Sequence, residues 1–357
     1  MSSLVIQTSF LGDVILATPL IAELGQRGDV DVLTTPQGGA ILANNPAIRR
    51  VIVYDRRASD TGVRGFLRTA RRLRSVAGPG GNRGTQSTGA ADPYEAVYLA
   101  QGSVRSALLA IAAGIGERVG FDTSDGRHLY TRRVRYRPDR HHAERLWWLS
   151  MSDCADPPQQ SQISPRLYPS HQEAVEIDRL LEDSPLDQSR PFVALAPGSV
   201  WGTKRWPFYP ELAAMIAREM NVIVIGGTDD IAAADTIVAQ LPPGTAISAA
   251  GKLSLLASAG LIGRARALVG NDSAPQHLAS AMGTPTLTIF GPTVPAFGFG
   301  PLADGSTSAG REGLACRPCN RHGPQRCPLG HWRCMRELSS GEVFEHLTAT
   351  LANRAIR

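Results

Sequence analysis

Short apolar runs alternate with segments of helical periodicity along this chain of 357 residues, and the alternation begins twice. In the first series, the apolar runs predict strands over 3–7, 30–36, 48–55, 94–100 and 118–121. The segments between them predict helices over 14–26, 37–45, 66–75 and 103–114. Strands that are apolar throughout are typical of a parallel sheet covered by helices on both faces. The first series therefore predicts an α/β domain.

The second series begins at Pro191, after a polar, proline-rich stretch and a helical segment over 171–183. It predicts strands over 192–199, 221–227, 245–251, 267–272 and 284–292, and helices over 209–219, 230–240, 254–262 and 274–282. We take residues 1–165 and 166–357 as two Rossmann-like domains. If they face each other across a cleft, the carboxyl ends of both sets of strands point into it, and ligands should bind there.

Positive charge is concentrated in the first domain, although the formal net charge of the chain is only +5. Nineteen arginines oppose nine Asp and Glu residues between Arg49 and Arg145. This region would attract an anionic partner, although solvated surface arginines would give the same count. A basic helix over 66–75 leads into residues 76–93, which are rich in Gly and small polar residues and predict a mobile surface loop. No apolar run has the length of a membrane span and no leader is evident, so we expect a cytoplasmic protein.

The turn after the first predicted strand contains Gly12 and Asp13 in "SLVIQTSFLGDVILATPL". It lacks the G-x-G-x-x-G pattern of a dinucleotide site. Asp13 could cap the following helix, a role worth about 1 kcal/mol. A carboxylate at the end of a strand is also where a general base would belong in a cleft. The local pattern leaves both roles open.

The segment "LAPGSVWGTKRWP" follows the first strand of the second domain and contains Ser199, Thr203 and Lys204. Backbone N–H groups, hydroxyls and a positive charge in one loop suit a pyrophosphate. Only one other lysine, Lys252, occurs in the chain. The tryptophans of this segment have packing as their simplest role.

The segment "VGNDSAPQHLASAMGTP" places Asp272, Ser273 and Ala274 between a strand and a helix. The N–H groups at the start of that helix would suit phosphate oxygens. Asp272 and Ser273 could equally cap the helix, and His277 could be an ordinary histidine on it. Polar residues lie between a strand end and the next helix in both domains, and this recurrence favours a binding role.

Four of the five cysteines lie in "CRPCNRHGPQRCPLGHWRC", at residues 316–334. Their spacing allows either a structural zinc site or free thiols, with His322 and His331 as alternative ligands. Four thiolates leave no open coordination position, which argues against a catalytic metal. The candidate ligands are Cys316, Cys319, Cys327 and Cys334.

The motifs "LGDVILATP", "PGSVWGTKRWP", "GNDSAPQHLASAMGTP" and "FGPT" occur in the order and at the spacing of glycosyltransferase family 9. The chain resembles this family of lipopolysaccharide heptosyltransferases over nearly its whole length, and most resembles the heptosyltransferase II group, which often has a similar cysteine tail. The resemblance implies a GT-B fold with an N-terminal acceptor domain and a C-terminal nucleotide-sugar domain. It also implies inverting, metal-independent transfer of a heptose or related sugar from an ADP-activated donor.

The resemblance also implies roles for individual residues. Asp13 matches the general base, and Lys204 and Thr203 match residues that contact the donor diphosphate. The other implied donor-binding residues are Ser199, Asp272, Ser273, Ala274 and His277. Residues 226–230 end a predicted strand of the same domain, and from this position alone we expect the nucleoside there. The implied acceptor-binding residues are Gly12, Ser103 and Arg105.

The implied partners are ADP-heptose and the anionic lipid A core. The basic helix would contact the inner membrane peripherally. No role is implied for nucleic acid. No cofactor is implied for catalysis. Two alternatives stay open: a GT-B nucleotide-sugar epimerase or hydrolase, and a non-catalytic nucleotide-sugar-binding protein. Replacing Asp13 would distinguish them, because transfer alone needs the base. "SAPQHL" lacks the glycine that the family more often has, so the donor sugar could differ.

Overall fold

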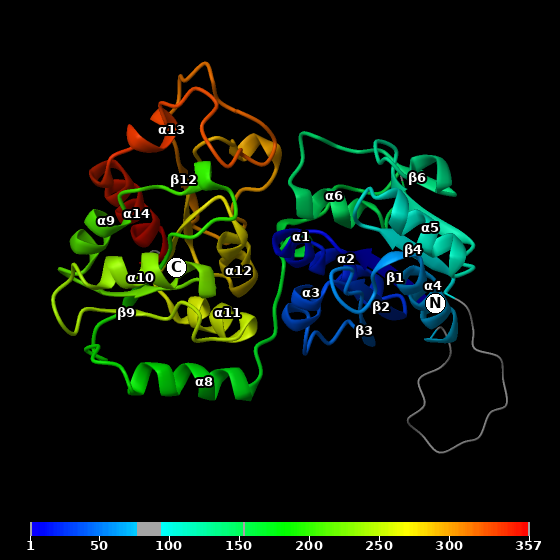
Figure 1. The fold of residues 1–357 in the computed structure, drawn as a ribbon, viewed down its shortest axis with the longest axis horizontal. Helices are drawn as coiled ribbons and strands as arrows, with labels where there is room; N and C mark the ends of the chain where they lie inside the picture. The colour runs from blue at the N-terminus through cyan, green and yellow to red at the C-terminus, as the bar shows by residue number, and fades with distance from the viewer. Residues whose placement is uncertain (1, 77–93, 153, 356–357) are drawn as a thin grey trace. The chain divides into compact units, whose positions relative to one another are not determined.

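The computed structural model describes residues 2–76, 94–152 and 154–355 (Figure 1). Most of the predicted mobile loop, residues 77–93, lies outside the described residues. The chain forms two compact units, residues 1–165 and 166–357.

The first unit contains a six-stranded sheet in the order β3-β2-β1-β4-β5-β6, with every adjacent pair parallel. Its strands are β1 (Ser2–Gln7), β2 (Asp29–Thr34), β3 (Arg50–Val53), β4 (Ala96–Leu99), β5 (Glu117–Phe121) and β6 (Arg132–Val134). Its helices are α1 (Leu11–Leu16), α2 (Thr18–Gly25), α3 (Pro36–Ile41), α4 (Gly62–Val76), α5 (Val104–Ala112), α6 (His142–Trp148) and α7 (Gln160–Ile163). The strand order is that of a Rossmann fold, as predicted.

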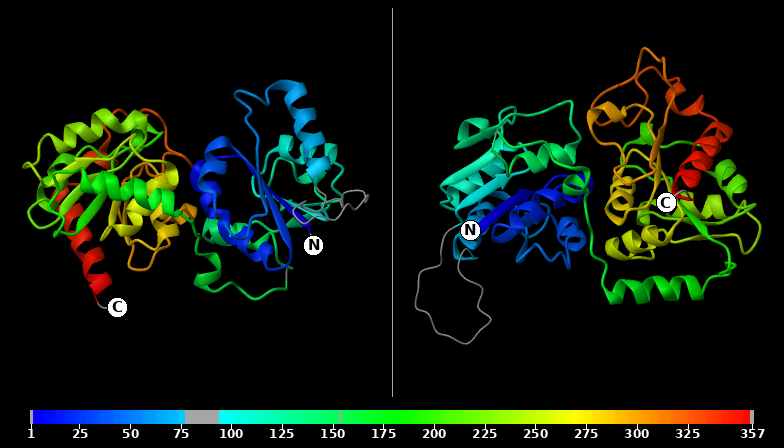
Figure 2. Two further views of the ribbon diagram at one scale, coloured as in Figure 1. Left: turned by 90° about the horizontal axis from the view of Figure 1, so that it is seen from below. Right: turned by 180° about the vertical axis from the view of Figure 1, so that it is seen from behind.

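The second unit repeats this topology in the order β12-β11-β10-β7-β8-β9, again all parallel. Its strands are β7 (Phe192–Ala196), β8 (Asn221–Val224), β9 (Ala246–Ser248), β10 (Leu268–Asn271), β11 (Thr286–Ile289) and β12 (Thr307–Ala309). Its helices are α8 (His171–Glu182), α9 (Tyr209–Ile216), α10 (Ile231–Val238), α11 (Leu255–Arg264), α12 (Ala274–Met282), α13 (Arg333–Arg336) and α14 (Ser340–Ala355). Figure 2 shows that helices cover both faces of each sheet.

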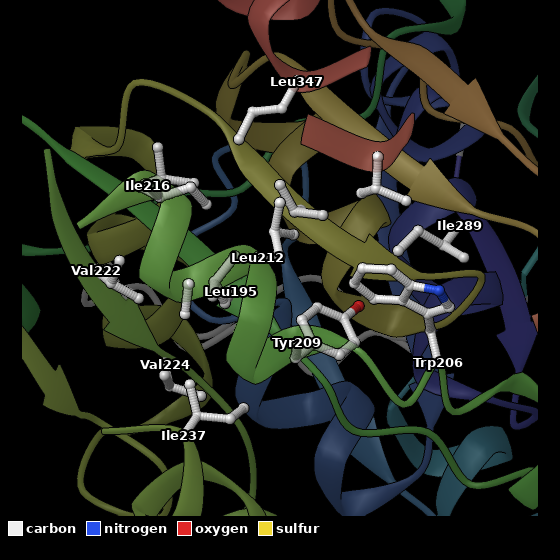
Figure 3. Packing of buried hydrophobic residues seen from close by; sticks show 14 of the residues in the cluster. Leu195, Trp206, Tyr209, Leu212, Ile216, Val222, Val224, Ile237, Ile289 and Leu347 are labelled. Atoms are coloured by element: carbon white, nitrogen blue, oxygen red, sulfur yellow. The ribbon is translucent and has the colours of Figure 1, made fainter. Parts of the chain in front are cut away.

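The core of the second unit explains the position of its functional loops. Tyr209, Leu212 and Ile216 of α9 pack against apolar side chains of the strands, and Leu347 of α14 joins the same cluster (Figure 3). Trp206 is buried in this core, and its indole Nε1 donates to the Leu338 carbonyl at 2.9 Å. The packing role proposed for this tryptophan is confirmed, and the residue anchors the end of the loop after β7.

The first helical segment begins earlier than predicted and is broken. A single helix over 14–26 was expected, whereas α1 begins at Leu11 and α2 begins at Thr18. Pro19 has no N–H for the Ile15 carbonyl, and the Thr18 hydroxyl donates to that carbonyl instead, at 2.8 Å. Asp13 is therefore in the first turn of α1. The N-cap residue is Phe10, so the interpretation of Asp13 as the cap is wrong.

A buried ion pair crosses the strands of the first unit. The Asp31 carboxylate of β2 is fully buried and accepts two hydrogen bonds from the Arg49 guanidinium, at 2.9 and 2.8 Å. It also accepts one from the Tyr94 hydroxyl at 2.6 Å. Burial and this bond raise the pKa of Tyr94 well above its ordinary value, and the bond to Asp31 likewise raises the pKa of Arg49. The pair ties β2 to the segments that precede β3 and β4.

None of the helices in the described part of the chain combines the length and the apolar character that crossing a bilayer requires.

Candidate active site

Each sheet has a switch point, where the loops after two adjacent strands leave in opposite directions. In the first unit these strands are β1 and β4, and in the second they are β7 and β10. Ligands of open α/β sheets bind at the carboxyl ends of such strands. The predicted site residues of both units follow these four strands.

Asp13 is held by side chains of its own unit. Its Oδ2 accepts a hydrogen bond from the Ser9 hydroxyl at 2.7 Å, and its Oδ1 lies 3.7 Å from Nε2 of His142, the first residue of α6. The Asp13 side chain remains 22% exposed. A fixed carboxylate that solvent can still reach is suited to accept a proton from a bound hydroxyl.

Gln7 completes this arrangement from the end of β1. The Ser9 hydroxyl lies 2.7 Å from Gln7 Oε1 as well as from Asp13, but a hydroxyl carries one proton. The buried Gln7 Nε2 has no hydrogen-bond partner among the described residues. The Ser9 backbone N–H also donates to Gln7 Oε1, at 3.3 Å, so this oxygen keeps a donor when the Ser9 hydroxyl proton is directed at Asp13.

Ser103 and Arg105 line a narrow pocket with Thr8, Tyr54 and Arg56. Arg105 Nε donates to the Tyr54 hydroxyl at 2.9 Å, which fixes the guanidinium at the pocket wall. Ser103 is the N-cap residue of α5 but its side chain makes no capping bond. The lining brings two positive charges and a serine hydroxyl together around a space too small to hold a water molecule.

Lys204 and Asp272 form a buried ion pair in the second unit. Lys204 Nζ lies 2.6 Å from Asp272 Oδ2 and 3.0 Å from the Asp272 carbonyl oxygen, and each side chain is 9% exposed. Lys204 ends the 3₁₀ turn η2 (Gly202–Lys204) after β7, and Asp272 follows β10. The pair therefore joins the two loops at the switch point. These two bonds use two of the three ammonium N–H groups, which leaves one for a ligand.

Two further side chains hold the Asp272 carboxylate. Gln276 Nε2 donates to Oδ1 at 2.9 Å, and the Thr293 hydroxyl donates to Oδ2 at 2.6 Å. Gln276 is itself fixed by the Thr288 hydroxyl, which donates to its Oε1 at 3.0 Å. Both carboxylate oxygens thus have partners, and the position of Lys204 is set by β11 and α12 as well as by its own loop.

The cysteine segment packs against the loop after β7. The backbone N–H and the hydroxyl of Thr203 both donate to the Pro324 carbonyl, and Gly202 N donates to Gln325 Oε1 at 3.1 Å. Gly323 has a φ of 83°, and a Cβ there would lie 3.3 Å from Thr203 Oγ1. The Thr203 hydroxyl is thus directed at the cysteine segment. Ser199 instead accepts from the Trp201 N–H within the loop, at 3.3 Å.

The start of α12 offers backbone donors. Ser273 is its N-cap residue and Ala274 its first residue, and the Ser273 side chain makes no capping bond. Nine residues of helix follow, so the first-turn N–H groups carry the positive end of the helix dipole. His277 lies farther along this helix and is buried.

The segment 226–230 approaches the loop after β7 closely. A Cβ on Gly198 would lie 2.3 Å from Asp230 Oδ1, and one on Gly226 would lie 2.6 Å from the Asp230 Cβ. A Cβ at Gly226 would collide with the Asp230 Cβ, whereas a Cβ at Gly198 would require the Asp230 carboxylate to move. The loops after β7 and β8 therefore form one continuous surface, whereas Lys252 is exposed in the turn after β9.

Of the two alternatives for the cysteines, a structural zinc site or free thiols, the structure does not support zinc. Within the residues described, no group of three or more Cys, His, Asp or Glu side chains is arranged to hold a metal ion. Cys319 Sγ donates to the Cys316 carbonyl at 3.4 Å, and Cys316 Sγ lies 3.7 Å from His331 Nε2. Cys334 is buried in the core of the second unit, while His322 stacks on Trp201.

Burial raises the pKa of the Cys334 thiol to about 11 and also raises the pKa of Cys319. Partial burial acts in the same direction on Cys327, but hydrogen bonds from the backbone of residues 329–332 outweigh it and lower its pKa. The thiols of this segment therefore differ in their readiness to ionise.

The family model of glycosyltransferase family 9 (heptosyltransferase) matches residues 90–330, which is more than half of the chain. The chain belongs to glycosyltransferase family 9. This family 9 chain is 25% identical over 324 residues to lipooligosaccharide heptosyltransferase 2 of Haemophilus influenzae, a match that covers 86% of the chain and 88% of the relative. The predicted family and enzyme class are confirmed.

Two solved structures show the fold that family 9 members share with this chain. One is the ADP-heptose heptosyltransferase II of Escherichia coli, with a TM-score of 0.77, 24% identity, and coverage of 99% of this chain and 100% of that one. The other is a family 9 glycosyltransferase of Veillonella parvula, with a TM-score of 0.81, 20% identity, and coverage of 98% and 97%. The predicted GT-B fold class is confirmed.

Four residues of this family 9 site escaped the sequence interpretation: Ser9, His142, Gln276 and Thr293. Thr293 lies within "FGPT" and Gln276 within "SAPQHL", and neither motif by itself indicates a role for the residue. His142 is 129 residues from Asp13 in sequence, so no local pattern connects them. The signal for Gln276 is its polar side chain within a helix of mostly small and apolar residues. Such a position indicates that the side chain has a buried partner.

Proposed function

We propose that this family 9 enzyme transfers a heptose from an ADP-activated donor to an inner-core lipopolysaccharide acceptor, with inversion at the anomeric carbon. The substrate class is supported by relatives that are named heptosyltransferases. One similar Escherichia coli structure is described as a heptosyltransferase with ADP-2-deoxy-2-fluoro heptose. The observation that carries the proposal is the Asp13 carboxylate, held by Ser9 and partly exposed at the carboxyl end of β1.

In this mechanism Asp13 acts as the general base. The acceptor hydroxyl oxygen attacks the anomeric carbon from the face opposite the diphosphate, while its proton moves to the Asp13 carboxylate. The bond between the anomeric carbon and the diphosphate oxygen breaks, and ADP leaves with the bonding electron pair. A single displacement of this kind inverts the configuration. In this proposal the His142 imidazole, whose Nε2 lies 3.7 Å from Asp13 Oδ1, limits the orientations that the carboxylate can take.

The second unit, residues 166–357, binds the donor in this proposal. The free N–H of Lys204 and the first-turn N–H groups of α12 would hold the diphosphate and stabilise the charge that develops on ADP. Asp272, Ser273 and Ala274 would contact the sugar and phosphates, with Ser199, Thr203 and His277 supporting the loops. The surface formed by Gly198 and residues 226–230 would receive the nucleoside.

The first unit, residues 1–165, binds the acceptor in this proposal. Ser103 and Arg105 follow β4 at the carboxyl edge of the sheet, and Gly12 precedes the base. Phosphates and sugar carboxylates of a lipopolysaccharide core are the anions that Arg105 and its neighbour Arg56 would attract. An enzyme with this acceptor would work at the cytoplasmic face of the inner membrane.

Catalysis in this proposal needs no metal, because Lys204 and backbone N–H groups supply the positive charge. Transfer should therefore continue in excess EDTA. Loss of activity in EDTA, restored by a divalent cation, would contradict this part of the proposal.

The Asp13→Asn variant tests the base. It should lower kcat for transfer by about 10²–10⁴-fold, because general-base catalysis typically contributes that much. The affinity for ADP should not change, since the donor-binding residues lie in the other unit. Asp139→Asn is the matched control, because Asp139 is an exposed carboxylate of the same unit with its side chain 70% exposed. Normal transfer by Asp13→Asn would refute the assignment.

The substrate assignment has its own test. The enzyme should be incubated with a panel of ADP-, GDP- and UDP-sugars and with truncated core acceptors, and the products identified by mass. Addition of a heptose only from the ADP donor supports the proposal. Release of free sugar or an epimerised donor without acceptor would show a hydrolase or an epimerase instead.

A further inference from the structure

Phe10 is the most exposed aromatic residue in the described part of the chain. It is 55% exposed, whereas every other Phe, Tyr and Trp that the structure describes is buried or partly buried. A single exposed apolar residue needs no explanation by itself. Phe10 is a different case because of its position next to the Asp13 carboxylate.

The start of α1 places these two side chains together. Phe10 is the N-cap residue of α1, and Asp13 is the third residue of that helix. The side chains at these two positions are neighbours, as the reciprocal bonds of a capping box require. The hydroxyl of Ser9, which precedes Phe10, already reaches Asp13 Oδ2 at 2.7 Å. An exposed aromatic ring and the proposed base therefore share one small surface at the carboxyl end of β1.

Phenylalanine at this position gives up a capping hydrogen bond. Elsewhere in the chain an N-cap side chain accepts a bond from the first turn of α3, α8 and α11, where the residues are Thr35, Ser170 and Ser254. Phe208, the N-cap residue of α9, also lacks the bond, but it packs against the core of the second unit and lies edge-on to Trp206. Packing explains Phe208. It does not explain Phe10, which is exposed.

The loop that carries Phe10 is fixed on both sides. Thr8 donates through its backbone N–H and its hydroxyl to Gln101 Oε1, at 2.7 and 3.0 Å. The Phe10 carbonyl accepts from the Val14 N–H at 3.2 Å, and Val14 is fully buried. The backbone at Phe10 is therefore held in place before a ligand arrives, which reduces the entropy lost when a ligand binds to the ring.

We propose that the sugar that accepts the heptose stacks on the Phe10 ring, which brings its reacting hydroxyl to Asp13. One face of a pyranose ring consists largely of C–H groups, which are weakly positive, whereas the face of an aromatic ring is negative. Stacking leaves the hydroxyls at the edge of the sugar free, so Phe10 sets the position of the sugar while Asp13 accepts the proton. This inference rests on the proposed function and adds an acceptor-binding residue to it.

Calorimetry with a deacylated, truncated core acceptor in the presence of ADP measures acceptor binding without transfer. Phe10→Leu keeps an apolar side chain but removes the ring, and it should raise the acceptor Kd about fivefold to tenfold, the usual effect of an aromatic contact. Phe10→Trp should keep the wild-type Kd within about twofold. Ile111→Ser is the matched control, because Ile111 is an apolar residue of the same unit that is 41% exposed near the end of α5.

Transfer kinetics and stability separate this role from a structural one. Phe10→Leu should raise the acceptor KM by the same factor as the Kd and leave the donor KM and kcat unchanged. Phe10→Ser should weaken acceptor binding at least as much, yet raise the midpoint of urea unfolding, because serine can cap α1. A lower unfolding midpoint in both variants would show that the ring packs within the protein, which would overturn the inference.

The inference and the proposed function fail in different ways. If Phe10→Leu binds and transfers to the acceptor like the wild type, the role of Phe10 is wrong and the reaction stands. If the wild type binds the acceptor through Phe10 but transfers no heptose, the reaction is wrong and the role of Phe10 stands. A rise in the donor KM instead of the acceptor KM would overturn the inference, and a wild type that does not bind the acceptor would overturn both.

Discussion

Replacing Lys204 by methionine removes one partner of the buried pair that joins the loops after β7 and β10. Methionine keeps most of the aliphatic volume of lysine, so the change isolates the ammonium charge. The Asp272 carboxylate would then keep the bonds from Gln276 and Thr293 but lose its counter-charge at 2.6 Å. Both side chains are only 9% exposed, so water cannot replace that charge.

The expected loss is about 3–5 kcal/mol in the free energy of unfolding, the usual effect of leaving one charge of a buried pair alone. Asp272→Asn should destabilise by a similar amount, because its NH₂ group would face either the Lys204 ammonium or the Gln276 amide. In the double variant the Asn oxygen can accept from Gln276, and its NH₂ can donate to the Thr293 hydroxyl. The double variant should therefore lose at least about 2 kcal/mol less than the sum of the single losses.

Urea unfolding of the full chain measures these differences, and hydrogen exchange of β7 and β10 assigns the affected transition to the second unit. ADP affinity should fall in both single variants, since the Lys204–Asp272 pair would no longer hold the loops after β7 and β10 together. Single losses below about 1 kcal/mol, or additive losses in the double variant, would refute the inference that this pair is desolvated and coupled.

Three other outcomes depend on burial and close contact. At pH 8, iodoacetamide should modify Cys327 well before Cys334, because Cys334, with a pKa of about 11, is only about one-thousandth thiolate. Peptide mass spectrometry measures the two rates. Equal rates, or protection of the thiols that a chelator releases, would contradict this prediction. Asp31→Asn should lower the free energy of unfolding by about 3 kcal/mol, with no effect on ADP affinity in calorimetry. Gly198→Ala should destabilise by about 1–3 kcal/mol and weaken ADP binding, because the Asp230 carboxylate has to move; unchanged stability and ADP affinity would contradict this.

Most of the fold could be predicted because its strands are short, apolar and buried on both faces. The central strands β1, β7 and β10 are examples, and each was predicted within a few residues. The edge strands β6 and β12 have three residues each, and β6 contains two arginines, so neither gives a usable periodic signal. These two strands join their sheets through backbone pairing with β5 and β11, which a local sequence pattern does not reveal.

The site was less predictable than the fold. Motif position led to Asp13, Lys204 and Asp272, because each lies within a few residues of the carboxyl end of a central strand. The bonds that hold them could not be predicted, since Asp13 and Asp272 are fixed by residues such as His142 and Thr293 that tertiary structure brings close. The cysteine spacing was compatible with zinc, but spacing alone does not direct side chains, and Cys334 is buried in the core instead.

The attachment of the cysteine segment to the loop after β7 has a consequence for how the protein is made. Gly202 and Thr203 bond to partners more than 120 residues later in the chain, and Trp206 bonds to Leu338, 132 residues later. A ribosome therefore synthesises this loop long before the residues that fix it. A nascent chain that has reached β11 holds every central strand of the second sheet, yet its loop after β7 lacks these anchors. Competence to bind nucleotide should thus appear late in translation, after the sheet has formed.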